Sequence, residues 1–290
     1  MQKISEHVYV FRDSRNTNLG LIVSAGGSAL VDSPMLPEDA RAWHDEVMAL
    51  TDDRQPLYVI NTDHHLGHSL GNWAFADARC VTHRHSAYFM LEKYDATFRN
   101  RLVESFRSAQ PLVAAGLEAV AMPRPRLGVV DEMTLHVGDV AVEIIHVGGH
   151  SPGAVIVRVG EDNVLFTGDV VVSDGYPSLG DAHSRQWLTA LDKIRALKPR
   201  LIVPGHGELA NHQTLDTMSG YIRALSETVG GYYASGMSRK DVVSKVRSLE
   251  NYPLDTDDRA RGEQRLKASL QRVYDEFKER DKELEKSREE

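Results

Sequence analysis

Histidine and aspartate residues directly follow four short apolar segments of this sequence. The apolar runs lie at 57–60, 142–147, 164–166 and 201–203. The polar residues that follow them, each set close to glycine or proline, are Asp63, His64, His65, His68, His150, Asp169 and His206. Loops at strand ends are where a rigid sheet presents functional side chains, and imidazole and carboxylate groups are ligands of zinc, iron and manganese. The spacing therefore predicts a metal site at one edge of a sheet, of the kind that activates water.

The composition of the 290-residue chain limits the alternatives. It holds 34 Lys and Arg against 42 Asp and Glu, a net charge of −8, which argues against a broad nucleic-acid or anionic-membrane surface. A single cysteine, Cys80, excludes an intrachain disulfide and a multi-thiolate metal cage; we expect it in a buried strand. No apolar run of about 18 residues is present. We therefore expect a cytoplasmic protein with a small-molecule substrate and neither a nucleic-acid nor a membrane partner.

The elements that must position the polar residues are strands and helices in mixed order. β-Branched and aromatic runs predict strands over 7–11, 19–23, 28–32, 57–60, 140–147, 154–159, 164–166 and 201–203. Apolar residues at helical spacing predict helices over 37–50, over most of 86–119 with a break at Pro111, and over 184–198. The stretch 122–126 is expected as a connector. This order indicates an α/β protein with sheets covered by helices.

Residues 211–290 differ in character from the rest of the chain. From 251 onward the sequence is rich in charge and carries no strand signal. An apolar seam at helical spacing consists of Leu266, Leu270, Val273, Phe277 and Leu284. We interpret the chain as a main domain over 1–210 and a helical C-terminal extension over 211–290 that packs on it. The alternative for the seam is a helix that forms a homodimer.

The order of the candidate ligands resembles the signature of the metallo-β-lactamase superfamily of metal-dependent hydrolases. That signature is a His-x-His-x-Asp-His loop, followed by a histidine, a bridging aspartate and a final histidine. The corresponding residues here are Asp63-x-His65-x-Gly67-His68, His150, Asp169 and His206. The resemblance covers about residues 5–210. It implies a four-layer αβ/βα sandwich with the site at one edge between two sheets, and it makes 1–210 the catalytic domain.

The resemblance implies two adjacent metal sites. Carried over residue by residue, site 1 would consist of Asp63, His65, His150 and Asp169. Site 2 would consist of His68, His206 and the bridging Asp169. The implied cofactor is zinc, as one or two ions, with iron or manganese as alternatives, and Asp169 and His206 are the expected catalytic residues.

Two positions depart from the family pattern. Asp63 stands where the first histidine is expected, and Gly67 replaces the aspartate that in the family also orients the attacking water. We expect Asp63 to be a ligand, and the alternative is an Asx turn in which it caps nearby amides. Without a carboxylate at Gly67, a second metal is not assured.

Other polar residues are expected to support the site. Asp32, at a strand end, is expected to hydrogen-bond the ligand loops. His64 should face away from Asp63 and His65 on an extended segment, with a supporting or surface role, or recruitment to the weakened site as the alternative. Tyr176 and His183 are candidates to border the pocket. The remaining histidines that we interpret as structural are His83, His85, His136, His146 and His212.

These observations lead to one expected activity and two alternatives. We expect a metallo-hydrolase that uses a metal-bound hydroxide on an activated acyl substrate, namely an ester, lactone, thioester or β-lactam. The first alternative is a non-hydrolytic Fe(II) enzyme with oxygen or sulfur chemistry, because two histidines and one carboxylate suit Fe(II). The second is a degenerate, metal-free binding module. RNA processing is disfavoured by the negative charge.

Overall fold

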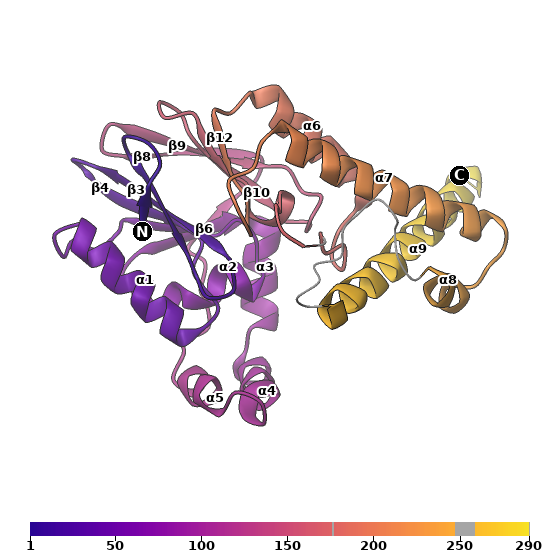
Figure 1. Cartoon of the computed structure of the whole chain (residues 1–290), viewed down its shortest axis with the longest axis horizontal. Helices are drawn as coiled ribbons and strands as arrows, with labels where there is room; N and C mark the ends of the chain where they lie inside the picture. The colour runs from indigo at the N-terminus through magenta and orange to yellow at the C-terminus, as the bar shows by residue number, and fades with distance from the viewer. Residues whose placement is uncertain (176, 247–258, 290) are drawn as a thin grey trace.

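The computed structural model describes residues 1–175, 177–246 and 259–289 and consists of two β-sheets flanked by helices (Figure 1). The first sheet has seven strands in the order of the sequence: β1 (Gln2–Lys3), β2 (Val8–Arg12), β3 (Asn18–Ser24), β4 (Gly27–Val31), β5 (Tyr58–Ile60), β6 (Arg79–His83) and β7 (Leu127–Val129). The second has five, in spatial order: β12 (Leu201–Val203), β11 (Val164–Phe166), β10 (Val155–Val159), β9 (Val140–His146) and β8 (Glu132–Val137). Strands β4 to β7 run parallel, as do β11 and β12, and the other pairs are antiparallel.

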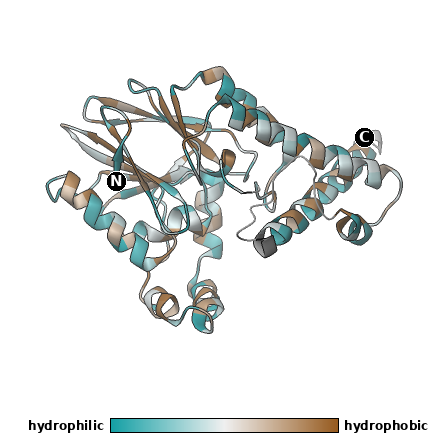
Figure 2. Ribbon diagram, viewed as in Figure 1, coloured by the Kyte–Doolittle hydropathy of each residue, from teal (hydrophilic) through white to brown (hydrophobic). Residues whose placement is uncertain are grey.

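Three apolar cores separate four layers. The first sheet packs on helix α1 (Pro37–Leu50) through residues such as Leu30 and Trp43. The two sheets pack on each other through side chains of alternating strand positions, among them Val142, Ile144 and Phe166. The outer face of the second sheet packs on helices α6 (Ser184–Leu197) and α7 (His212–Ala234), and α9 (Arg259–Glu289) packs in turn on α7. Figure 2 shows apolar residues on the strands and on parts of the helices that flank them. This arrangement confirms the expected αβ/βα sandwich.

The helical region that precedes β7 in the sequence differs in detail from the expectation. It consists of α3 (Arg84–Lys93), α4 (Ala96–Arg107) and α5 (Pro111–Glu118), and before β6 the chain forms α2 (Leu66–Ser69) and the 3-10 turn η1 (Leu70–Phe75). The expected break at Pro111 is present: α4 ends at Arg107 and Pro111 begins α5, because the first helical position needs no N–H donor and tolerates the fixed φ of proline. Strands β7 and β8 were not expected from the sequence pattern. Cys80 is buried in β6 as expected.

Of the C-terminal helices, α7 lies beside α6 and extends beyond the second sheet, and α9 packs on α7 (Figure 1). Helix α7 is followed by the short α8 (Arg239–Lys245) and by α9. The expected seam of α9 is buried at Leu266, Leu270 and Val273, whereas Leu284 is 50% exposed. The seam therefore packs mainly within the chain, while the homodimer stays a prediction. No helix in the described part of the chain has the length and apolarity needed to cross a membrane.

Candidate metal centre

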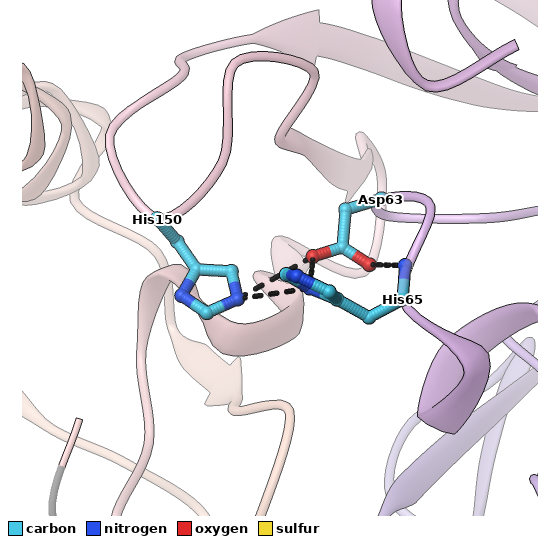
Figure 3. Close-up of side chains that lie close together, drawn as sticks. All are labelled: Asp63, His65 and His150. Carbon is cyan, nitrogen blue, oxygen red and sulfur yellow. Dashed lines mark hydrogen bonds and ion pairs between the residues drawn. The ribbon is translucent and has the colours of Figure 1, made fainter. Parts of the chain in front are cut away.

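Asp63 and His65 lie in the loop between β5 and α2, where the chain turns sharply. Oδ1 of Asp63 accepts a hydrogen bond from the backbone N–H of His65 at 2.8 Å, and Oδ2 lies 2.6 Å from His65 Nδ1 (Figure 3). The Asx turn, which was the alternative role for Asp63, is therefore present. It uses only Oδ1, so Oδ2 is left available as a ligand atom. Its side chain is 2% exposed.

His150 completes a first cluster with Asp63 and His65. It follows β9 in a loop where Gly148 and Gly149 have φ values of 63° and 89°, a conformation that glycine adopts without strain. His150 Nε2 lies 3.2 Å from His65 Nδ1 and 3.4 Å from Asp63 Oδ2 (Figure 3). The three ligand atoms lie within 4.8 Å of one another. Three atoms at this separation can reach one ion with bonds of about 2.0–2.2 Å.

A second cluster lies beside the first and consists of His68, Asp169 and His206. Asp169 follows β11 and His206 follows β12, and because these strands are parallel both residues emerge at the same sheet edge. Asp169 Oδ1 lies 3.3 Å from His68 Nε2 and 3.4 Å from His206 Nε2. Asp169 Oδ2 lies 3.9 Å from His150 Nε2. The carboxylate of Asp169 therefore stands between the two clusters.

Gly205 allows Asp169 to take this position. A Cβ atom at Gly205 would overlap Asp169 Oδ1 and would lie 2.7 Å from the backbone nitrogen of Asp169. Any side chain there would displace the carboxylate. Position 205 therefore requires glycine, because the backbone there lies so close to Asp169.

The charges of the first cluster are strongly coupled. Burial acts to raise the pKa of Asp63, but the charge and hydrogen bond of His65 together with the charges of His68 and His150 outweigh it and hold that pKa well below its usual range. Burial acts to lower the pKa of His65, but Asp63 and Asp181 raise it to about 10. Burial, together with the nearby charge of His65, lowers the pKa of His150 to about 4. His150 is therefore neutral at pH 7, the form in which imidazole binds a metal.

The second cluster contains buried polar atoms that fit a cation. His68 Nε2 and Asp169 Oδ1 are buried and face each other at 3.3 Å, but neither makes a hydrogen bond of regular geometry in the described part of the chain. Buried polar atoms without partners are costly and rare in folded proteins. A divalent metal ion would satisfy both atoms, so the donor set fits the cofactor that the sequence implies.

Comparison with known proteins identifies the family. The family model described as the Metallo-beta-lactamase superfamily matches residues 12–206. The chain belongs to the metallo-beta-lactamase superfamily. The matched range ends at His206, so the C-terminal helices lie outside it.

Two relatives show the extent of sequence similarity within the superfamily. The chain is 31% identical over 117 residues to a metallo-beta-lactamase type 2 of Bacteroides fragilis, which covers 37% of this chain and 47% of the relative. It is 26% identical over 167 residues to a hydroxyacylglutathione hydrolase of Prochlorococcus marinus (strain MIT 9312), which covers 56% of this chain and 65% of the relative. The chain thus spans about half to two thirds of the length of these relatives.

Solved structures share the fold over nearly the whole chain. A metallo-beta-lactamase family protein from Thermus thermophilus matches with a TM-score of 0.67 at 19% identity, covering 95% of this chain and 93% of that one. A sec-alkylsulfatase from Pseudomonas sp. matches with a TM-score of 0.71 at 14% identity, covering 94% of this chain and 49% of that one. Such coverage includes most of the C-terminal helices, so these two structures share the fold of that part of the chain as well.

Asp32 supports the segment after β5 that carries Asp63, His65 and His68. Its two oxygens accept hydrogen bonds from the backbone N–H and the hydroxyl of Thr62 at 2.7 and 2.8 Å, and Oδ2 lies 2.9 Å from His68 Nδ1. The other ring nitrogen of His68 thereby faces Asp169. Carboxylates in this position fix the tautomer and orientation of a ligating histidine.

We expect Asp32→Asn to weaken metal binding about 10–100-fold while the protein stays folded, because the amide cannot supply the charge that orients His68. Asparagine tolerates the φ of 63° found at Asp32, so the backbone should not change. Titration with Zn²⁺ against a competing chelator measures the effect. Asp95→Asn, which alters the cap of α4 away from the site, is the matched control, and equal affinities of the two variants would contradict the role of Asp32.

The prediction that His64 faces away from His65 is wrong. The two imidazole rings are 4.5 Å apart, and His64 Nε2 lies 3.8 Å from Asp181, which also contacts His65. The physical reason is the turn at Asp63, which removes the extended geometry on which the prediction depended. His64 is buried and packs on Phe89 at a ring distance of 4.1 Å.

The other expected pocket residues have different places in the fold. His183 is the N-cap residue of α6: its Nδ1 accepts a hydrogen bond from the N–H of Gln186, and its own N–H donates to the carbonyl of Gly149. It borders a separate cavity of about 300 Å³ beside α6 and α9. Tyr176 lies outside the described residues. His83 stacks on His146 at 3.8 Å and donates from Nε2 to the Val130 carbonyl, which fits the structural roles expected for both.

The sequence interpretation missed Asp181. Its carboxylate lies 3.0 Å from His65 Nε2, and hydrogen bonds from His64 and His65 hold its pKa well below the usual range. The sequence feature that could have indicated it is an aspartate next to Gly180 and two residues before His183, in the segment that follows Asp169.

Proposed function

We propose that this protein is a metal-dependent hydrolase that acts on an activated acyl substrate and uses zinc, as one or two ions. The observation that carries the proposal is the position of Asp169, whose two oxygens face His68 and His206 on one side and His150 on the other. A carboxylate so placed can be shared by two cations. Membership of the superfamily supports metal-dependent hydrolysis in general.

Asp63, His65 and His150 would hold one ion, and His68, Asp169 and His206 would hold the other. A divalent cation bound there lowers the pKa of a coordinated water to about 7 and polarises a substrate carbonyl. Asp63 adds negative charge where a third histidine would be neutral, so it would make an ion held there a weaker Lewis acid and would favour a harder cation. His206 and Asp169 would both be ligands of the second ion.

A cavity beside the first cluster is suited to a small substrate. Its volume is about 490 Å³, and its walls include His64, Tyr88, Phe89, Gly153, Asp181 and Arg272. Pockets of about 300–1,000 Å³ with aromatic walls and a few polar groups are typical of small-molecule sites. Two relatives are named for hydrolysis of a hydroxyacylglutathione and of a β-lactam, which supports an acyl compound as the substrate. The cytoplasmic location stays a prediction.

The test combines metal analysis with a substrate panel. Metal content per chain is measured after purification, and the metal-free protein is then loaded with Zn²⁺, Mn²⁺ or Fe²⁺. Chromogenic ester, lactone, thioester, β-lactam and phosphodiester substrates are assayed with the wild type and with His150→Ala. We expect zinc-dependent turnover of at least one acyl substrate that His150→Ala abolishes. Tight iron with oxygen-dependent turnover, or a protein that binds no metal, would overturn the proposal in favour of the redox enzyme or the binding module.

We expect Gly67→Asp to raise occupancy of the second cluster towards a second metal equivalent. Gly67 has no atom within 4 Å of the position where a Cβ would lie, and it has no positive φ, so a side chain fits without strain. The added carboxylate supplies a hard, charged donor. Elemental analysis measures the metal content of Gly67→Asp and of Gly67→Asn, which has a side chain of the same size without the charge. An unchanged metal-to-protein ratio in Gly67→Asp would show that Gly67 does not limit binding at the second site.

A further inference from the structure

Asp181 and His65 form a carboxylate–imidazole pair at the border of the first cluster. Asp181 Oδ2 lies 3.0 Å from His65 Nε2, whereas Asp63 Oδ2 and His150 Nε2 approach the other ring nitrogen, Nδ1, at 2.6 and 3.2 Å. The two nitrogens lie at different corners of the imidazole ring. Asp181 therefore contacts His65 on the side that points away from the cluster.

The same arrangement occurs at His68 in the second cluster. There Asp32 contacts Nδ1 at 2.9 Å, and Nε2 faces Asp169 at 3.3 Å. In each cluster one histidine offers one nitrogen to the site and the other nitrogen to a carboxylate. Such carboxylates fix the ring orientation and increase the basicity of the ligating nitrogen.

Helix α9 holds the segment that carries Asp181. The hydroxyl of Ser269 accepts a hydrogen bond from the N–H of Leu179 at 3.2 Å, and Arg272 Nε donates to the carbonyl of Ala182 at 2.8 Å. The carboxylate of Glu276 accepts from the N–H of Ser184 at 2.9 Å.

These three residues of α9 are spaced 3 and 4 apart, so they lie on one face of the helix. They bind the chain on both sides of Asp181, which is itself partly exposed. The contacts are long-range in sequence, and they come from a helix outside the range that the family model matches. The C-terminal extension thus reaches the border of the metal centre.

We propose that Asp181 is a positioning residue that orients His65 for metal binding, and that helix α9 holds Asp181 in place through Ser269, Arg272 and Glu276. The proposal rests on the proposed function in that it takes His65 as a ligand through Nδ1. We therefore expect the C-terminal extension to be required for high metal affinity, in addition to its packing on the rest of the chain.

The first test compares metal affinities of variants at position 181. Zn²⁺ and Co²⁺ are titrated against a competing chelator, and the visible spectrum of the Co²⁺ protein is recorded. We expect Asp181→Ala to lower the affinity about 10–100-fold and to change the Co²⁺ spectrum, while the number of ions bound at saturation stays that of the wild type. Asp181→Glu should restore part of both, because it keeps the carboxylate. Asp139→Ala, an exposed carboxylate in the turn between β8 and β9, should match the wild type.

The second test addresses helix α9. Arg272→Met keeps the length of the side chain but removes the donor to Ala182, and we expect it to lower metal affinity in the same direction as Asp181→Ala. Lys278→Met makes a similar exchange at an exposed position of α9 and should have no effect. Equal affinities of the Arg272→Met and Lys278→Met variants would overturn the role of α9.

His150→Ala separates failure of this inference from failure of the proposed function. If His150→Ala loses metal while Asp181→Ala binds as tightly as Asp139→Ala, the metal centre stands and the positioning role is wrong. If Asp181→Ala binds one ion fewer at saturation, Asp181 is a ligand and the positioning role is also wrong. If the wild type and His150→Ala bind metal equally weakly, the metal centre itself fails, and the inference fails with it.

Discussion

Replacing Asp169 by asparagine is expected to remove metal from both clusters and to lower kcat/KM for any acyl substrate by at least about 100-fold. Loss of a residue that contacts a metal ligand, but not the metal, already lowers metal affinity or activity about 10–100-fold. Asp169 is itself an expected metal ligand, so its loss should have a larger effect. Its Oδ1 faces His68 and His206, and its Oδ2 faces His150. The amide has nearly the same shape but carries no charge, so it cannot balance two cations. Elemental analysis and steady-state kinetics measure the two effects.

The control for this prediction is Asp192→Asn, which removes an exposed carboxylate on α6 that pairs with Arg195. Circular dichroism of both variants checks that the fold persists. This check is needed because Asp32 and Asp169 together raise the pKa of the buried His68 against the effect of burial, so Asp169 also interacts with His68 in the metal-free chain. A folded Asp169→Asn protein that keeps two metals and normal turnover would show that the carboxylate is not shared by the clusters.

Three substitutions at Asp63 are expected to separate its two functions. Oδ1 accepts from the N–H of His65, and Oδ2 faces His65 Nδ1 and His150 Nε2. Asp63→Asn keeps an oxygen for the turn but loses the charge, so we expect a small change in the melting temperature of the metal-free protein and a large loss of metal affinity. Asp63→Ala should lose both, since the turn loses its acceptor as well; such a hydrogen bond contributes about 0.5–1.5 kcal/mol. Asp63→His restores a nitrogen ligand and should recover metal binding.

Thermal unfolding with and without Zn²⁺, together with chelator competition, measures these effects. Saturation with metal at 100 times its Kd should stabilise the wild type by about 2.7 kcal/mol, and the Asp63→Asn variant should show much less of that gain at the same Zn²⁺ concentration. If Asp63→Asn binds Zn²⁺ like the wild type, Asp63 serves only the turn. If Asp63→His is folded but binds no metal, the family geometry does not apply at this position.

Several features of the fold and of the site could be predicted from short stretches of sequence. The strands over 19–23 and 28–32 and the helix over 37–50 agree with β3, β4 and α1 because their apolar periodicity is local. The position of the candidate ligands at strand ends also follows from local pattern, since parallel strands such as β11 and β12 deliver Asp169 and His206 to one edge. Asp32 was assigned its hydrogen bonds to the ligand loops for the same reason.

The features that the sequence did not reveal depend on contacts between distant residues. The direction of His64 is decided by a side-chain hydrogen bond that turns the chain at Asp63, and no periodicity reports such a turn. Asp181 meets His65 across 116 positions of sequence, and Arg272 meets Ala182 across 90. The sequence by itself determined which residue types could bind a metal and which strands would present them. Only the tertiary structure decided which carboxylate orients each histidine, because that choice depends on how loops and the C-terminal helix pack against one another in space.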